Sequence, residues 1–307
     1  MTRHLRIGTR GSALARAQAQ WVQHRLTAAL PGLTAELVII RTTGDRITDR
    51  PLSAVGGKGL FVKEIEEALL AGEVDCAVHS LKDLPAELAA GLMIAAVPER
   101  EDPRDVALTR QEGGLSTLPR GAQVGTSSLR RAALVRAFRP DLQVIGLRGN
   151  VDTRLRKLDD GAVDAIVLAG AGLRRLGIVR PHAELLAAEE FVPAIGQGAL
   201  AIESPRGEIA ELLRAIDHRP SHEAIDAERA FLVAVGGSCV TPLAAHATVA
   251  GETLTLRALI AEPDGTRVIR GRREGRTSEG ARLGTELAQA LLAEGGAEIL
   301  RALEAAL

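Results

Sequence analysis

Four polar residues follow a short apolar run near residue 80, and their side chains could bind a charged ligand. The run Cys76-Ala77-Val78 predicts a buried strand, and His79, Ser80, Lys82 and Asp83 come directly after it. The carboxyl end of a strand is the usual place for a ligand on an open α/β sheet. A solvated connection between a strand and a helix is the other interpretation of these residues.

Two arginines fall in the first turn of a predicted helix. A strand ending near residue 125 leads into this helix through Thr126, Ser127 and Ser128, and Arg130 and Arg131 follow. Backbone N–H groups and hydroxyls at a helix start form an anion site. Two cations there oppose the helix dipole, at about 0.3–1 kcal/mol each when exposed. An external anion would compensate for them, although two solvated arginines would also explain the pattern.

Further arginines occupy similar positions. Arg148 and Arg154 flank the turn Gly149-Asn150, and Arg10 precedes Ser12 at the start of another predicted helix. Several separate arginine sites suit a ligand with several carboxylates better than a single phosphate. The sequence has no Walker-type loop and no dinucleotide glycine fingerprint, so we expect neither ATP nor NAD.

The two cysteines differ in their settings. Cys239 lies in the glycine-rich stretch 236–242, which suits a reactive or modified thiol, although an inert loop cysteine is the commoner case. Cys76 lies inside an apolar run and is predicted to be a small core residue. Two cysteines give neither a disulfide framework nor a metal-ligand spacing, so we expect no metal.

Composition limits the classes of function. The chain has 307 residues, a net charge of -1, 2% aromatic residues and no tyrosine. This balance favours no nucleic-acid partner, because single-strand binding relies on aromatic stacking. No apolar run reaches membrane-spanning length and the first residues lack a signal-peptide core, so we expect a cytoplasmic protein without a membrane partner.

The order of elements predicts an α/β fold. Strands at 5–8, 35–40 and 74–78 alternate with helices at 13–29 and 60–71. A stretch without periodicity, 42–59, precedes the helix at 60–71. A loop of this length in a compact domain is usually a functional lid or disordered, and we expect a lid.

The second half of the chain repeats features of the first. Residues 7–12 resemble 124–128, and residues 72–78 resemble 161–167, in the same order. We therefore predict two related lobes of parallel-sheet type with a cleft between them. Beyond residue 220 a helix, three strands and a helical region broken at Gly295-Gly296 predict a small C-terminal α+β domain with a three-stranded antiparallel sheet.

Taken together, these motifs resemble the porphobilinogen deaminase (hydroxymethylbilane synthase) family. The resemblance extends nearly from end to end, and eight motifs occur in the family's order. They are residues 6–12, 55–61, 79–85, 99–105, 125–131, 147–154, 193–198 and 237–242.

The resemblance implies an architecture and an activity. It implies two lobes like those of type II periplasmic binding proteins, the first formed by 1–98 with 198–217 and the second by 103–193, and a third domain at 220–307. It implies a dipyrromethane cofactor attached to Cys239 by a thioether. The expected reaction condenses four porphobilinogen molecules, releases ammonia and ends with hydrolysis to hydroxymethylbilane, in a monomeric transferase.

The resemblance also implies roles for individual residues. Asp83, Lys82 and Arg10 are expected to be catalytic, with Asp83 stabilising a cationic azafulvene and Lys82 keeping Asp83 ionised. The residues expected to bind the cofactor, besides Cys239, Asp83 and Lys82, are Ser80, Thr126, Ser127, Ser128, Arg130, Arg131, Arg148, Gly149 and Asn150. The residues expected to bind the substrate are Arg10, Ser12, Arg148, Arg154, Arg175, Lys58 and Phe61.

Two other interpretations compete with this one. The lobes and arginines alone would fit a non-catalytic two-lobed receptor for a polycarboxylate, which has no use for Cys239. An enzyme that uses Cys239 as an acyl nucleophile would carry an alkylatable thiol instead of a permanent adduct.

Overall fold

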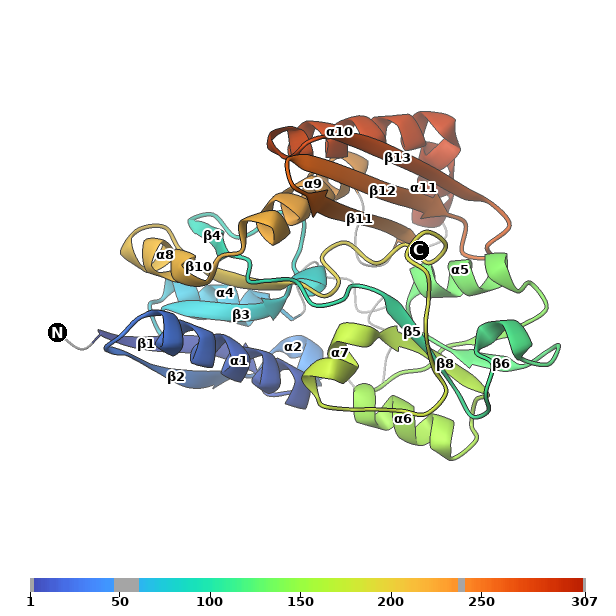
Figure 1. Cartoon of the computed structure of the whole chain (residues 1–307), viewed down its shortest axis with the longest axis horizontal. Helices are drawn as coiled ribbons and strands as arrows, with labels where there is room; N and C mark the ends of the chain where they lie inside the picture. The colour runs from blue at the N-terminus through green and yellow to red at the C-terminus, as the bar shows by residue number, and fades with distance from the viewer. Residues whose placement is uncertain (1–2, 47–60, 237–240, 306–307) are drawn as a thin grey trace. The chain divides into compact units, whose positions relative to one another are not determined.

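The computed structural model describes residues 3–46, 61–236 and 241–305 (Figure 1). The chain forms two compact units, Met1–Glu101 with Gly198–His222 and Asp102–Gln197 with Glu223–Leu307. Most of the predicted lid, 42–59, lies outside the described residues. Its first part is a short helix, α2 (Thr43–Arg46), where the sequence predicted a loop.

The first unit contains a five-stranded sheet in the order β2-β1-β3-β10-β4. β1, β2 and β3 are parallel, but β10 runs antiparallel to both of its neighbours. The predicted parallel arrangement is confirmed for β1, β2 and β3, whereas β10 joins the sheet antiparallel from a segment more distant in the sequence. The elements of this unit are β1 (Arg3–Arg10), α1 (Ala13–Ala29), β2 (Leu33–Ile40), α4 (Lys63–Leu70), β3 (Cys76–Ser80), β4 (Leu92–Ala96), β10 (Leu200–Pro205) and α8 (Glu208–Leu213).

Helices cover both faces of this sheet. On one face Val22 and Leu26 of α1 pack with Ile7, Val78 and residues of α8. On the other face α4 packs against the opposite side of β3. Because successive strand residues point to opposite faces, Cys76 and Val78 face α1, while Ala77 and His79 face α4.

The second unit repeats the sheet of the first, with the order β7-β6-β8-β5-β9. β6, β7 and β8 are parallel, and β5 runs antiparallel to β8 and β9. The position of each strand matches one in the first sheet, which confirms the predicted duplication. The elements are β5 (Asp105–Thr109), β6 (Gln123–Gly125), α5 (Leu129–Phe138), β7 (Gln143–Ile145), α6 (Val151–Asp159), β8 (Ala165–Ala169), α7 (Gly170–Arg175) and β9 (Ala183–Leu185).

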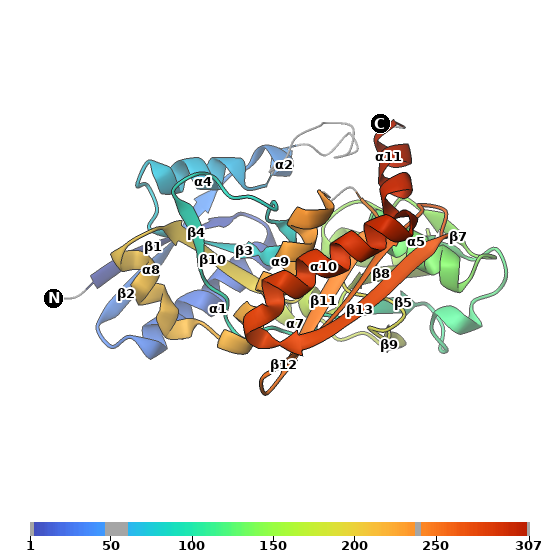
Figure 2. The same ribbon diagram turned by 90° about the horizontal axis from the view of Figure 1, so that it is seen from above.

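The C-terminal sheet of the second unit is antiparallel, in the order β11-β12-β13, as predicted. Helix α10 lies across β12 and β13 (Figure 2). The helical region beyond it bends at Gly295, whose φ of 111° is in the range that favours glycine. The elements are α9 (Arg219–Val235), β11 (Leu243–Ala250), β12 (Thr253–Ala261), β13 (Val268–Arg276), α10 (Gly280–Leu291) and α11 (Ala297–Ala305).

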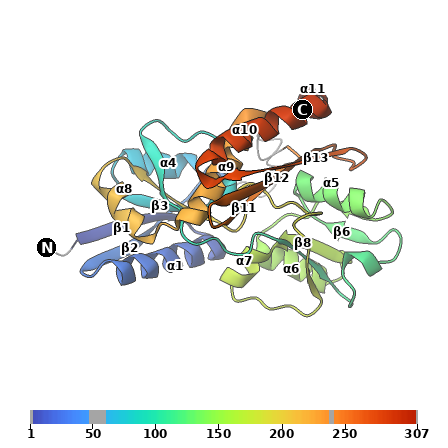
Figure 3. The same cartoon turned by 45° about the horizontal axis from the view of Figure 1, so that its top comes forward.

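Helix α5 packs between the five-stranded sheet of the second unit and the C-terminal sheet (Figure 3). Ala133 and Leu134 of α5 share one core with Val124 of β6 and Leu259 of β12. Helices α6 and α7 cover the other face of the five-stranded sheet. The α/β class with a C-terminal α+β part is thus confirmed, while the boundaries of three separate domains stay a prediction. None of the described helices is long and apolar enough to cross a membrane.

Candidate active site

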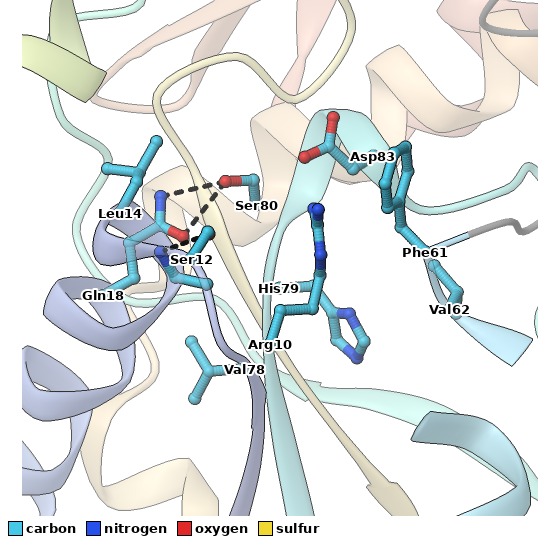
Figure 4. A pocket seen from close by; sticks show the side chains of 11 residues that line it. Arg10, Ser12, Leu14, Gln18, Phe61, Val62, Val78, His79, Ser80 and Asp83 are labelled. Carbon is cyan, nitrogen blue, oxygen red and sulfur yellow. Dashed lines mark hydrogen bonds between the residues drawn. The ribbon is translucent and has the colours of Figure 1, made fainter. Parts of the chain in front are cut away.

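A small cavity of about 60 Å³ lies at the carboxyl ends of β1 and β3 (Figure 4). Its lining brings together five residues that the sequence predicted for the site and two that it did not assign a role. These residues are Arg10, Ser12, Phe61, Ser80 and Asp83, and Gln18 and His79.

Asp83 is held by a short 3₁₀ turn, Leu81–Asp83, that directly follows β3. The N–H of Leu81 donates to the carbonyl of Ala199 at 3.1 Å, and the N–H of Leu84 donates to that of Leu81 at 3.1 Å. Leu81 and Leu84 are buried while Asp83 is exposed. Two apolar anchors therefore fix the backbone on either side of the carboxylate. Lys82 belongs to the same turn and is half-buried.

Arg10 is oriented by an aromatic ring. Its guanidinium carbon lies 4.0 Å from the centroid of the Phe61 ring, at the end of β1 (Figure 4). A cation over a ring face is stabilised by the ring quadrupole. Ser12 caps α1 by accepting the N–H of Ala15 at 3.3 Å. The structure thus brings Arg10, Ser12 and Phe61 together, while their role in binding substrate stays a prediction.

Gln18 is a pocket residue that the sequence analysis missed. It lies in α1 and is 3% exposed. Its Nε2 donates to Ser80 Oγ at 2.9 Å, and the Ser80 hydroxyl donates to Gln18 Oε1 at 3.1 Å. The sequence did contain a sign of this: Gln18 lies four residues from both Leu14 and Val22, so a polar side chain interrupts the apolar face of the helix.

In the second unit, Arg130 and Arg131 share one buried carboxylate. Arg130 Nη1 lies 2.8 Å from Asp105 Oδ2, and Arg131 Nη2 lies 2.8 Å from Asp105 Oδ1. Burial alone would raise the pKa of Asp105, but the two guanidinium groups outweigh it and hold that pKa well below its usual range. Gln197 completes the network by donating to Asp105 Oδ1 at 2.8 Å and accepting from Arg131 at 3.1 Å.

The sequence analysis expected an anion from outside the chain to compensate for the two arginines at the start of α5. In the structure, Asp105 is that anion. It is fully buried at the start of β5 and was missed as a functional residue. The available signal was an acidic residue directly before the apolar run 106–108. Its partners are clear only from the structure, in which Arg131 also donates to the carbonyl of Val167 on the neighbouring strand β8. One carboxylate neutralises only one of the two guanidinium charges, so an excess positive charge stays in the interior.

More positive charge gathers beside this pair. Burial lowers the pKa of Arg154, and the nearby cations Arg131 and Arg148 lower it further. Asn150 caps α6 by accepting the N–H of Thr153 at 2.9 Å, and Arg154 Nε donates to the carbonyl of Gly149 at 2.8 Å. Three guanidinium groups that repel one another suit an anionic ligand with more than one acidic arm.

The three small residues before α5 shape the turn into this helix. Ser127 donates to the carbonyl of Leu147 at 2.6 Å, whereas Thr126 Oγ1 accepts the N–H of Ser128 at 3.2 Å. Ser128 caps α5 by accepting the N–H of Arg131 at 3.4 Å. Because Thr126 and Ser128 act as acceptors in these bonds, their hydroxyl protons can still be donated to a ligand.

The remaining predicted residues have different outcomes. Arg175 ends α7 and is half-buried, and its role stays a prediction. Lys58 and Cys239 lie outside the described residues. Cys76 is fully buried, and burial raises the pKa of its thiol, as expected of a core residue. Within the described ranges, no group of three or more histidine, cysteine or acidic side chains could hold a metal ion.

The fold and the site define an α/β protein with two related sheets, one bearing a carboxylate pocket and the other a cluster of buried arginines. Residues 5–211 match the family model described as "Porphobilinogen deaminase, dipyromethane cofactor binding domain". Residues 222–293 match "Porphobilinogen deaminase, C-terminal domain". The chain belongs to the porphobilinogen deaminase family.

Curated relatives agree with this assignment. A porphobilinogen deaminase of Nitratidesulfovibrio vulgaris is 51% identical over 302 residues, which are 97% of this chain and 96% of the relative. One of Syntrophobacter fumaroxidans is 50% identical over 300 residues, 97% of each chain. Among solved structures, the methionine binding protein MetQ aligns with a TM-score of 0.45 at 15% identity, over 73% of this chain and 94% of that one. That likeness is too remote to carry an argument.

Proposed function

We propose that this member of the porphobilinogen deaminase family, a transferase of tetrapyrrole biosynthesis, uses Asp83 to stabilise positive charge and its arginines to hold acidic arms. The proposed reaction joins four porphobilinogen molecules head to tail, with ammonia lost at each step. Hydrolysis then releases hydroxymethylbilane. Family membership favours this reaction over a non-catalytic receptor or an acyl-transferring thiol enzyme.

Dipyrromethane is the proposed cofactor, attached through a thioether to Cys239. When bound, it supplies the primer on which the pyrrole chain grows. The second unit suits such a group because its acetate and propionate arms need cations, and Arg131, Arg148 and Arg154 gather there. The buried Nε of Arg130 has no hydrogen-bond partner in the described structure and could donate to one of these carboxylates.

Asp83 acts on the charge that develops when ammonia leaves. Breaking the C–N bond of the aminomethyl pyrrole creates a cationic azafulvene, and a carboxylate fixed near the pyrrole N–H groups stabilises that cation. Asp83 suits this role because its backbone is anchored and its side chain enters the cavity with Arg10. Lys82 lies in the same turn, next to Asp83 in the chain.

The other predicted residues complete the proposal as binding groups. Arg10, Ser12, Arg148, Arg154 and Arg175 bind acidic arms of the substrate, and Lys58 and Phe61 border the lid side. Ser80, Thr126, Ser127, Ser128, Gly149 and Asn150 act as neutral donors or shape the turns that present backbone N–H groups. A cytoplasmic monomer without nucleic-acid or membrane partners belongs to the same proposal.

The observation that carries the proposal is the meeting of Asp83 and Arg10 in one cavity of a chain that belongs to this family. The test is ammonia release from porphobilinogen by the unaltered chain and by Asp83→Asn. We expect a loss of about 10²–10³-fold in kcat, as when one preorganised charge-stabilising group is removed. A variant that folds normally and turns over at the original rate would refute the role of Asp83.

A further inference from the structure

A buried histidine–carboxylate pair lies beside the Asp83 pocket. Ala77 of β3 pairs with Glu203 of β10, so His79, two residues further along β3, lies diagonally across from Glu203 on the same face. His79 Nε2 lies 3.0 Å from Glu203 Oε2, and the two side chains are only 4% and 0% exposed. Desolvating both groups is costly, so the pair needs a reason beyond packing.

Glu203 is unusual even for a buried acid. In the ranges that the structure describes, neither of its carboxylate oxygens takes part in a well-aligned hydrogen bond, and the contact with His79 is close but poorly aligned. Buried polar groups without such partners are rare and occur at sites where the charge state matters. The closest charged contact of Glu203 among the described residues is the imidazole of His79.

His79 connects this carboxylate to the cavity. It lines the same cavity as Arg10, Ser80 and Asp83, and its ring lies below the Arg10 side chain in the view of Figure 4. Because Nε2 is directed at Glu203, Nδ1 is the ring nitrogen that can exchange a proton with a ligand. An imidazole backed by a buried carboxylate is the arrangement that general bases use.

We propose that His79 is a general base of this site and that Glu203 orients it and stabilises its protonated form. This inference rests on the proposed function. In each condensation the C–N bond of the incoming aminomethyl group breaks, and its electron pair leaves with ammonia. The α-carbon of the acceptor pyrrole provides the electron pair of the new C–C bond. The hydrogen on that carbon then leaves as a proton to Nδ1 of neutral His79, and its bonding electrons restore the aromatic ring.

Several charged groups lie near His79. Glu203 on β10 lies 3.0 Å from its Nε2, the charge of Glu66 on α4 interacts with both members of the pair, and Arg10 and Asp83 line the same cavity. Burial raises the pKa of Glu66, and the charge of Glu203 adds to this. Removing the charge of Glu203 makes the imidazolium less favourable, so the acid limb of the kcat profile should move to lower pH.

The test compares three variants in the holoenzyme. For His79→Asn we expect kcat to fall by about 10²–10⁴-fold with little change in KM. A primary isotope effect should also appear with porphobilinogen deuterated at its free pyrrole α-carbon, because removal of that proton becomes slow. Glu203→Gln should lower kcat and move the acid limb to lower pH. Glu67→Gln, on the exposed side of α4 where the side chain is 63% exposed, is the matched control and should leave kcat and the isotope effect unchanged.

A titration without turnover gives an independent readout. The imidazole resonance that disappears in His79→Asn identifies His79, and its titration midpoint should move to lower pH in Glu203→Gln but not in Glu67→Gln. An unmoved midpoint would overturn the proposal, as would a folded His79→Asn variant without an isotope effect. If His79→Asn does not fold, the pH profile of kcat in Glu203→Gln decides. Turnover by the unaltered chain reports separately on the proposed function, because the titration does not depend on it.

Discussion

Replacing Asp105 with asparagine tests whether one buried carboxylate holds the arginines of the second unit. Asp105 is 0% exposed and contacts Arg130 and Arg131 at 2.8 Å each. The substitution keeps the shape of the side chain but leaves two buried guanidinium groups without their counter-ion. Breaking a buried ion pair in this way typically costs about 3–5 kcal/mol. At about 2–4 °C per kcal/mol for a unit of this size, the melting temperature should fall by roughly 6–20 °C.

Thermal unfolding followed by circular dichroism measures this loss, and Asp159→Asn is the matched control. Asp159 also pairs with an arginine of the second unit, Arg180, at 2.7 Å, but it is 51% exposed. Exposed pairs contribute about 0.2–1 kcal/mol, so the control should shift the melting temperature far less. Equal shifts for the two variants would refute the idea that Asp105 supports the arginine cluster.

The same variant predicts a pH dependence. The pKa of Asp105 is lowered in the folded chain, so its contribution is complete above the ordinary aspartate pKa of about 3.9 and is lost only as the pH falls through the lowered value. The stability difference between the unaltered chain and Asp105→Asn should therefore be constant from pH 8 to about pH 5 and shrink only in stronger acid. A difference that shrinks near neutral pH would point to another group.

Three further predictions concern single side chains. Arg154→Met should weaken substrate binding by about 1.5–3 kcal/mol, or roughly 10–150-fold in KM, because it removes a charge-assisted contact to an acidic arm; an unchanged KM would contradict this role. Gly284→Ala should destabilise the chain by about 1–3 kcal/mol in a denaturant titration, since its Cβ would lie 2.9 Å from the backbone N of Phe231, whereas Gly146→Ala, with nothing within 4 Å, should be neutral. Cys76→Ala should keep both turnover and the covalent adduct, as read by intact mass, because Cys76 is a core residue.

The sequence predicted the elements that carry their own local signals. Helix α1 begins at Ala13 because Ser12 caps it, and it ends before the turn at Pro31-Gly32, so its predicted bounds agree with the structure. The duplication was visible because each lobe repeats a glycine turn at the same strand end. Ser80 and Asp83 were expected at the carboxyl end of a strand, and they meet Arg10 and Ser12 because the carboxyl ends of neighbouring parallel strands lie at one edge.

Long-range pairing was beyond the sequence argument. Strand β10 reaches the first sheet from about 120 residues beyond β3, and no periodic pattern encodes which way it runs. For the same reason Asp105 and Glu203 were missed, although each is the buried counter-ion of a residue that the sequence analysis had noted. A carboxylate inside an apolar strand is a signal, but only the sheet order reveals its partner.

The intact mass of the purified chain, followed by peptide mapping, tests the central claim most directly. We predict a permanent adduct with the mass of dipyrromethane on the peptide that contains Cys239, and its loss together with activity in Cys239→Ser. An unmodified Cys239 thiol in a preparation that converts porphobilinogen would contradict the account.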